Sequence, residues 1–376
     1  MTGSKRLSVQ ICASIRRLDQ PTKPSSGPKT PQSSLVLWAN LAVIYLVWGS
    51  TYFGIAIAIE TIPPFLMAAI RFALAGLILI TWDLVRHPEA RRLPTRRQVI
   101  DSAIVGGLLL GVGNGFVVFA EKTVPSGIAA ILIGMMPLWF ALLGWLYLRQ
   151  RLPRLVVSAI ILGFGGVVLL IWPFGDGANH YNALGIFVLF LAELGWANGS
   201  IYSVRRAKLP PSPLTASGFQ MLAGAAFTGI EALVVGEPAT FNPAAVSPAS
   251  LVAVVYLILF GSMLAYTSYA WLLRNAPLSL VGTYAYVNPV VAVGLGTVFL
   301  HEPISPRMLI ASVVIIAAVA IIVTARGQLA GVGASGEAGA PTRDPAHDDP
   351  AHGLPTRNAA APGSDHAPDL AGPARP

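Results

Sequence analysis

The sequence predicts an all-α integral membrane protein of ten transmembrane helices, arranged as two inverted repeats of five helices each. Three observations support this prediction. The 376 residues are 54% hydrophobic but only 11% charged, whereas soluble domains carry roughly 25% charged residues. Apolar runs of about 20 residues, the length of a helix that spans a bilayer, recur along the chain. A long segment of the first half also returns in the second half.

The repeated segment covers residues 122–151 and 274–302, with matching positions 152 residues apart. The corresponding pairs are Lys122 and Arg274, Pro125 and Pro277, Pro137 and Pro289, Gly144 and Gly296, and Leu148 and Leu300. Each copy is long enough to cross the hydrocarbon core, roughly 30 Å thick, as a helix. Pro137 and Pro289 fall near mid-span, where we expect paired functional kinks; simple helix bending is the alternative.

The ten expected spans lie between two polar ends. They cover residues 35–59, 65–82, 100–119, 126–148, 155–172, 184–204, 215–235, 251–273, 278–300 and 308–325. Residues 1–34 and 327–376 have polar, Pro-rich compositions without an apolar period, so we expect two disordered cytoplasmic tails. The spans then form a first repeat over residues 35–172 and a second over residues 184–326.

Positive charges alternate between the expected loops. The inner loops hold twelve Lys and Arg residues when the N-terminal tail is placed inside, and the outer loops hold only Lys122 and Arg307. The positive-inside rule therefore places both termini in the cytoplasm. Because five is odd, the second repeat enters the membrane from the opposite side, which makes the repeats inverted. Many secondary transporters share this plan and hold their substrate near the midplane.

The composition argues against several classes of protein. The net charge of +8 follows from topology rather than from a basic face, so no nucleic-acid partner is expected. The only cysteine is Cys12 and the six histidines are scattered, so we expect no metal site and no cofactor. No phosphate-binding Gly-rich loop of an ATPase is present. A membrane-embedded enzyme is disfavoured because the spans hold one clear acid and no histidine.

Four short motifs follow one another along these spans. They are Trp48-Gly-Ser-Thr-Tyr-Phe, Pro63-Pro64 with Arg71-Phe, Val124-Pro-Ser-Gly-Ile-Ala-Ala, and Gly282-Thr-Tyr-Ala-Tyr-Val-Asn-Pro-Val-Val-Ala. With these motifs the chain resembles the EamA-type transporters of the drug/metabolite transporter superfamily, over about residues 35–326. The resemblance implies a secondary transporter of the cytoplasmic (inner or plasma) membrane. It would move small metabolites, amino acids or drugs, often outward, without ATP.

Two charged residues fall inside the expected spans. Arg71 lies about seven residues into the second span, where a charge is costly unless it faces the bundle interior or water. It is a candidate anchor for a substrate carboxylate or phosphate, or the partner of a buried acid; snorkelling to the outer interface is the alternative. Glu193, midway along the sixth span, is a candidate coupling carboxylate for proton exchange. Pairing with Arg71 or with a hydroxyl is the alternative for Glu193.

Aromatic and polar side chains complete the candidate substrate pathway. Two related sets are Trp48, Ser50 and Tyr52 on the first span, and Trp196, Ser200 and Tyr202 on the sixth. They are expected to line a cavity, with interface belts or plain packing as alternatives. Buried phenols and amides need partners, which a substrate or a neighbouring helix can supply. Residues of this kind are Tyr284, Asn288 and Asn114.

Four glutamates lie at or near span ends, where we expect solvated loop charges. They are Glu121, Glu231, Glu237 and Glu302.

The favoured function is an exporter that alternates between inward-open and outward-open forms, with a small-molecule substrate and the lipid bilayer as partners. An uptake permease of the same fold and a non-transporting membrane scaffold or sensor are the alternatives. The sequence leaves open whether the protein forms a homodimer.

Overall fold

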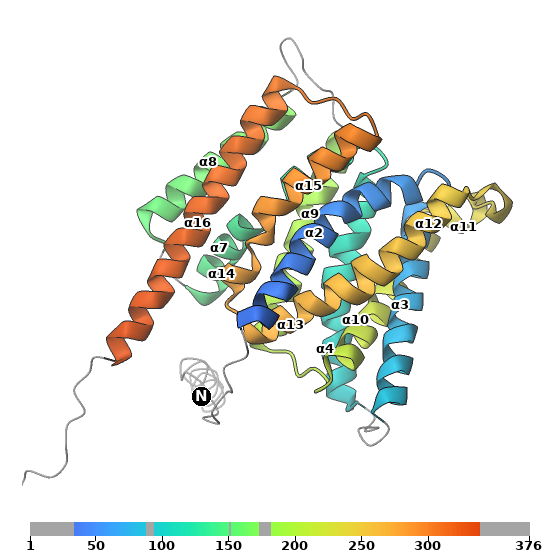
Figure 1. Ribbon diagram of the computed structural model, residues 1–376, viewed down its shortest axis with the longest axis horizontal. Coiled ribbons are helices and arrows are strands. Elements are labelled where there is room, and N and C mark those ends of the chain that lie inside the picture. Colours follow the sequence, from blue (N-terminus) through green and yellow to red (C-terminus); the bar gives the residue numbers. More distant parts are fainter. Residues whose placement is uncertain (1–33, 88–93, 150–151, 173–181, 339–376) are drawn as a thin grey trace, which may run out of the picture. The chain divides into compact units, whose positions relative to one another are not determined.

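A computed structural model describes residues 34–87, 94–149, 152–172 and 182–338. Throughout these residues the regular structure is helical, and helices lie over all ten predicted ranges (Figure 1). The tails predicted at residues 1–33 and 339–376 lie outside the described residues. The all-α class expected of the sequence is therefore confirmed for the part of the chain that the structure describes.

The first repeat contains five helical segments, two of them composite. They are α2 (Ser34–Ala58); α3 (Pro64–Arg86); α4 (Arg96–Gly106) with η2 (Gly107–Gly115) and α5 (Phe116–Ala120); α6 (Ser126–Ile133) with α7 (Met136–Leu148); and α8 (Arg154–Ile171).

The second repeat has a matching order. It consists of α9 (Ala183–Arg205); α10 (Pro213–Val234); the short α11 (Glu237–Thr240) and η3 (Pro243–Ala245); α12 (Pro248–Tyr256) with η4 (Leu257–Tyr266) and α13 (Thr267–Asn275); α14 (Leu278–Val281) with α15 (Tyr284–Phe299); and α16 (Pro306–Ala338).

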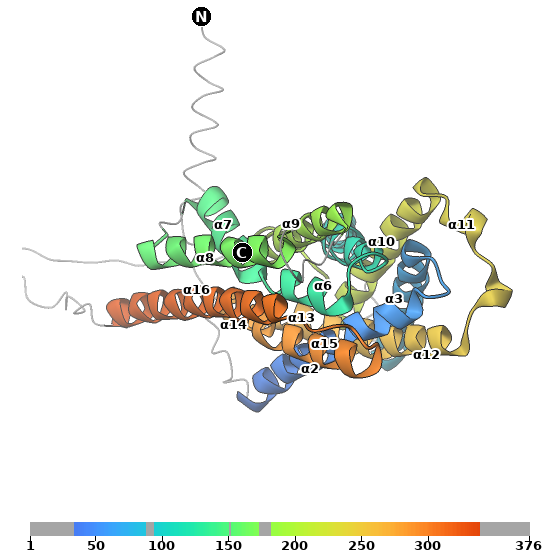
Figure 2. The ribbon, with the colours of Figure 1, turned by 90° about the horizontal axis from the view of Figure 1, so that it is seen from above.

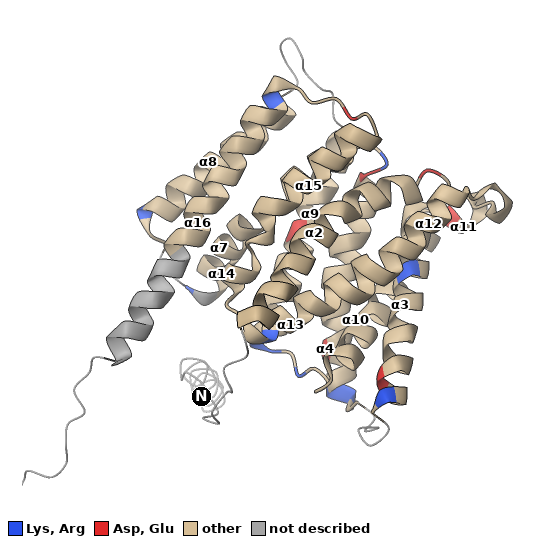
Figure 3. Ribbon diagram, in the orientation of Figure 1, with Lys and Arg blue, Asp and Glu red and all other residues tan. Residues whose placement is uncertain are grey.

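Eight of these segments are long and apolar enough to cross a membrane. The other two have identifiable differences. α10 carries Gln220 and Glu231, which lower its hydropathy, and a break at Gly282–Thr283 separates α14 from α15. Charged residues lie mainly at helix ends, which leaves the middle of most helices uncharged (Figure 3). The protein is thus an integral membrane protein, and ten crossings with inverted repeats stay a prediction.

Local sequence signals explain where several helices begin. Thr95 and Gln98 form a reciprocal capping box at the start of α4. Side chains of Asn182, Ser212 and Ser247 accept hydrogen bonds from the first free N–H groups of α9, α10 and α12. These caps satisfy donors that have no partner within the helix.

Helix α16 extends beyond residue 325, where the tenth predicted span ends. The helix continues to Ala338 without interruption. Extending an existing helix fixes one residue for each new hydrogen bond and avoids the cost of nucleation. The polar composition of residues 327–338 therefore did not by itself mark the end of the helix.

The two matched prolines behave differently from each other. Near Pro137 the chain leaves the helix at Gly134–Met135 and restarts at Met136, which puts the proline in the first turn of α7. Pro289 instead lies inside the continuous helix α15. The two regions pack together, since a Cβ added at Gly134 would lie 3.1 Å from Cγ of Pro289. The interruption of the second copy falls earlier, at Gly282–Thr283. Paired functional kinks at Pro137 and Pro289 stay a prediction.

A feature that the sequence did not predict is a pair of π-helical segments. η2 covers Gly107–Gly115 and η4 covers Leu257–Tyr266, in the corresponding helix of each repeat. π-helical turns are rare, and they occur frequently at functional sites. Here both segments contribute residues to the same cavity.

Helices of the two repeats pack closely through small residues. A Cβ added at Gly76 of α3 would lie 2.9 Å from the carbonyl oxygen of Gly218 on α10. The C-terminal end of α3 meets the N-terminal end of α10, where Thr215 Oγ1 donates a hydrogen bond to Asp83. α3 and α10 therefore run antiparallel, the relation that inverted repeats require. α8 and α16 also lie side by side (Figures 1 and 2), with Gly166 against Ile315.

The expectation of four solvated glutamates is wrong. Glu237 caps the start of α3, accepting from the N–H groups of Phe65 (3.3 Å) and Leu66 (2.8 Å). Glu302 caps α6 in the same way and accepts from Ser126 N (2.8 Å) and Oγ (2.7 Å) and Gly127 N (3.1 Å). A carboxylate at a helix N-terminus meets free N–H groups and a favourable dipole.

The remaining two of these glutamates, Glu121 and Glu231, also differ from the expectation. Both oxygens of Glu121 and Oε2 of Glu231 are buried and have no hydrogen-bond partner among the described residues. Glutamates that lie at the ends of the predicted spans are thus buried in the structure rather than solvated.

Candidate substrate-binding cavity

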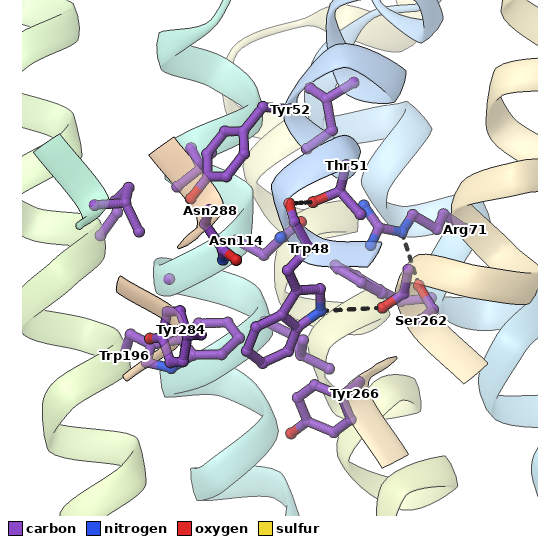
Figure 4. A pocket seen from close by; sticks show the side chains of 18 of the residues that line it. Trp48, Thr51, Tyr52, Arg71, Asn114, Trp196, Ser262, Tyr266, Tyr284 and Asn288 are labelled. Atoms are coloured by element: carbon purple, nitrogen blue, oxygen red, sulfur yellow. Dashed lines mark hydrogen bonds between the residues drawn. The ribbon is translucent and has the colours of Figure 1, made fainter. Parts of the chain in front are cut away.

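A cavity lies between the helices of the two repeats (Figure 4). Its wall is formed by α2, α3, the η2–α5 segment and the α6–α7 junction of the first repeat, and by α9, η4 and α15 of the second. Predicted pathway residues in the wall are Trp48, Tyr52, Arg71, Asn114, Trp196, Tyr284 and Asn288. The fold thus brings together side chains that are up to 240 positions apart in the sequence. Their role in transport stays a prediction.

Arg71 is the cation of the cavity wall. Its side chain is 2% exposed, which rules out snorkelling to the interface in this conformation. The Nε–H group donates a hydrogen bond to Ser262 Oγ over 2.7 Å, and the guanidinium lies 5.0 Å from the ring centre of Phe72. Nη1 is buried and has no hydrogen-bond partner in the part of the chain that the structure describes. The ion pairs of the described residues are His87–Asp83 and Arg97–Asp101, so Arg71 does not pair with a buried acid.

Two amide side chains face the same space. Oδ1 of Asn114 and Oδ1 of Asn288 are buried and lack hydrogen-bond partners among the described residues. Leaving a buried polar group without a partner costs about 1–3 kcal/mol, and more for a charged group. A ligand with one anionic group and N–H or O–H donors would relieve these costs at Arg71 and at both amides.

Aromatic rings form a second part of the wall. Trp48 contacts Trp196 and Tyr284 edge to face, with ring centres 5.3 Å and 5.4 Å apart. Tyr269 packs behind them, 4.9 Å from the ring centre of Trp48. Tyr266, on the wall itself, donates a hydrogen bond to Oε1 of the buried Gln220 over 2.7 Å. This rigid aromatic surface suits a flat or apolar part of a ligand.

Glu193 is buried near the cavity but does not line it. Its side chain is fully buried, and Oε2 accepts a hydrogen bond from Trp139 Nε1 over 2.7 Å. Oε1 has no partner. The expected structural partners, Arg71 or a hydroxyl, are therefore wrong, because an indole N–H takes this place. The preceding residue, Ala192, lines the cavity.

Ser50 and Ser200 lie outside the cavity wall. Ser50 Oγ is 2.6 Å from the hydroxyl of Tyr256, and Ser200 Oγ is 2.8 Å from the hydroxyl of Tyr269. Both also donate to backbone carbonyls of their own helix. These two hydroxyls join helices together rather than meeting the cavity.

The sequence did not identify several cavity residues. The polar ones are Thr51, Ser262 and Tyr266, and Phe72 and Gly261 lie among them. The sequence could have indicated Ser262 only by its position in an apolar span. A single serine there usually donates its hydroxyl to a backbone carbonyl of its own helix. Only the packing of η4 against α3 gives it a role, since a Cβ at Gly261 would lie 3.0 Å from Nη2 of Arg71.

These features define the class of the protein. It is a helical integral membrane protein with a central cavity that combines one cation, two amide acceptors and an aromatic wall. Within the described ranges, no group of three His, Cys, Asp or Glu side chains is placed to hold a metal ion. The chain belongs to the EamA-like transporter family, which matches it twice, over residues 34–172 and 183–324.

Curated relatives cover most of the same region. The chain is 38% identical over 291 residues to the "Uncharacterized inner membrane transporter YedA" of Escherichia coli strain K12, covering 77% of this chain and 90% of that protein. It is 30% identical over 281 residues to "Protein PecM" of Dickeya dadantii, covering 73% and 88%. A solved crystal structure with 22% identity matches 79% of this chain and 99% of its own, with a TM-score of 0.57. This last match supports the fold alone.

Proposed function

We propose that the protein is a secondary transporter that exports a small molecule through the central cavity by alternating access. The observation that supports this most is the set of unpartnered polar atoms at Arg71, Asn114 and Asn288, which face one cavity built by both repeats. Rocking of one repeat against the other would expose such a site to each side in turn. Relatives named as transporters, YedA among them, support the same conclusion.

The proposed substrate has three chemical parts. A carboxylate or phosphate would accept hydrogen bonds from the free Nη1 of Arg71, because charge-assisted pairs of this kind are strong and directional. N–H or O–H groups would donate to the amide oxygens of Asn114 and Asn288. An apolar or aromatic part would lie on Trp48, Trp196 and Tyr284. Amino acids and related small metabolites or drugs have this combination.

Glu193 is the proposed coupling carboxylate. A buried acid with one unpartnered oxygen beside the cavity can take up or release a proton as water reaches it from one side or the other. The hydrogen bond from Trp139 stabilises the ionised form and holds the side chain in place. Proton exchange at Glu193 would then be linked to the alternation of the two repeats.

The proposed location is a cytoplasmic (inner or plasma) membrane, with several crossings and both termini in the cytoplasm. The lipid bilayer and a small-molecule substrate are the proposed partners, and a homodimer is compatible with them. Labelling of single cysteines placed at residues 60 and 90 by an impermeant reagent on intact cells tests the orientation. We expect labelling at residue 60 only; the reverse pattern would contradict the topology.

Transport itself is tested in proteoliposomes. Candidate labelled amino acids and monocarboxylates are offered with and without a proton gradient, to the wild type and to Arg71→Ala. We expect gradient-dependent movement of an anionic or zwitterionic compound that Arg71→Ala abolishes. Movement driven by the opposite gradient would indicate an uptake permease of the same fold, and no movement of any compound would argue for a non-transporting role.

A further inference from the structure

Glu121 is an ionisable side chain that the proposed transport cycle does not use. It lies one residue beyond α5, where the third helical segment leaves its span. Both of its carboxylate oxygens are buried, and neither has a hydrogen-bond partner among the described residues. A carboxylate with no donor at either oxygen is costly as an anion, because burial removes the water that would solvate it.

The charged groups around Glu121 come from three directions. Arg71 of α3 and Tyr52 of α2, both in the cavity wall, interact with it electrostatically. Glu302, from the segment between α15 and α16, is the third group, and it is held in place as the cap of α6. The adjacent Lys122 is exposed, and α9, which packs against α5, contributes Glu193 at a deeper level, ten residues into the helix.

These neighbours make the neutral form of Glu121 the stable one. Burial raises the pKa of Glu121 well above its usual range, and repulsion by Glu302 raises it further. The attraction of Arg71 opposes this shift but does not overcome it. Glu121 therefore holds a proton at pH values where an exposed glutamate is ionised. While it is neutral, the charge of Arg71 stays uncompensated and available to a ligand.

We propose that Glu121 is a proton-binding site linked to anion binding at Arg71: a proton on Glu121 strengthens the binding of an anionic ligand, and its loss weakens that binding. The linkage rests on the anion site of the proposed function, because it requires the ligand anion to bind at Arg71. An ionised Glu121 would compete with the ligand for the field of the same guanidinium. By thermodynamic reciprocity, a bound anion strengthens proton binding at Glu121 to the same extent.

The proton site is tested first without any ligand, by thermal unfolding of the full-length protein in detergent across a range of pH. A group whose folded pKa lies above its unfolded value contributes stability that is complete below the unfolded pKa, about 4.3 for glutamate, and is lost as pH rises through the folded pKa. The wild type is therefore expected to lose Tm as pH rises into the neutral range. Glu121→Gln, which mimics the protonated acid in shape, is expected to lose less. The control Glu60→Gln, at an exposed glutamate, should follow the wild type.

Equal slopes of Tm against pH for the wild type and Glu121→Gln would overturn the proton site.

Binding of benzoate, measured by calorimetry in two buffers of different ionisation enthalpy, then tests the linkage. We expect the wild type and Glu60→Gln to take up protons on binding, and their affinity to weaken roughly threefold or more as the pH rises through the pKa of Glu121. Glu121→Gln should take up none and keep its affinity across that range.

The outcomes separate the two proposals. A Glu121→Gln variant that binds benzoate with the wild-type pH dependence overturns the linkage. A wild type that shows the Glu121-dependent unfolding slope but does not bind benzoate overturns the anion site, and the linkage with it, while the proton site stands.

Discussion

Arg71 and Glu193 are both almost completely buried in the middle of the protein, but their surroundings differ. The α3 side presents Arg71 to the cavity, with Ser262 holding one N–H group and another left free. On the α9 side Glu193 does not line the cavity and accepts a hydrogen bond from Trp139. The comparison teaches that the cation is exposed to a ligand while the acid is screened from it. The proposed anion site and the proposed coupling carboxylate are therefore separate groups.

The largest effect is expected from Arg71→Ala. Removing a buried cation that pairs with a ligand anion costs several kcal/mol, so the affinity for benzoate should fall by about 100-fold or more. Titration followed by thermal shift measures this loss. Arg86→Ala, on the same helix but exposed at its end, is the matched control and should leave affinity unchanged. Equal losses in both variants would contradict an anion site at Arg71.

Glu193→Gln tests the acid side of the comparison. The amide cannot release a proton, so transport driven by a pH gradient should fall by about tenfold or more, a loss typical of proton-transfer groups. Substrate counterflow without a gradient should persist, because Glu193 does not line the cavity. Full gradient-driven transport in Glu193→Gln would remove its coupling role. Glu60→Gln serves as the exposed control.

Ser262→Ala sharpens the role of the cation. The variant removes the acceptor at 2.7 Å from Nε of Arg71 and leaves the charge in place. A hydrogen bond to a charged group is worth about 1.5–3 kcal/mol, so benzoate affinity should fall roughly tenfold. Ser262→Thr, which keeps a hydroxyl, should recover part of the affinity. A loss as large as that of Arg71→Ala would mean that the site has collapsed, and unchanged affinity would mean that Ser262 does not position Arg71.

Glu302→Ala concerns stability rather than binding. It removes the acceptor for three donors at the start of α6. Loss of a helix cap costs about 1 kcal/mol, which should lower Tm by a few degrees. Glu302→Gln keeps an acceptor and should show the smaller loss that removal of the charge alone gives. Identical Tm values for the wild type and Glu302→Ala would argue that the cap is not important.

The smallest effects are expected from Ser50→Ala and Ser200→Ala. Their hydroxyls join Tyr256 and Tyr269 and lie outside the cavity wall. Affinity and transport should change by less than about threefold, the scale of one exchanged neutral hydrogen bond. A tenfold loss of affinity in either variant would show that the wall includes these residues.

The two serines also show where the sequence was a poor guide. Ser50 and Ser200 shared motifs with Trp48 and Trp196, so proximity along the chain placed them in the same predicted site. On a helix, residues two apart point to different faces, and four apart means one full turn of height. Trp48 reaches the cavity while Ser50 meets Tyr256 on the neighbouring helix. Trp48 and Ser50 are thus separated, whereas Trp196 and Ser200 both bond to the hydroxyl of Tyr269. Ser262 is joined to Arg71 from 191 positions away.

The sequence by itself determined the membrane class, the positions of the ten helical segments and the family. These properties depend on local composition and on the repeat: a bilayer-length apolar run must form a helix because lipid offers no partner for its backbone. The sequence also placed Arg71 inside a span, but it left open whether the side chain is buried or snorkels to the interface.

Only the tertiary structure decided which polar atoms remain without partners, and where. The indole that holds Glu193, the caps made by Glu237 and Glu302, and the buried carboxylate of Glu121 all depend on contacts between segments far apart in the chain. Such contacts depend on how the helices pack. They also depend on the local π-helical geometry, which changes the direction of side chains over a few residues. No periodicity in a single segment contains that information, because it belongs to pairs of segments.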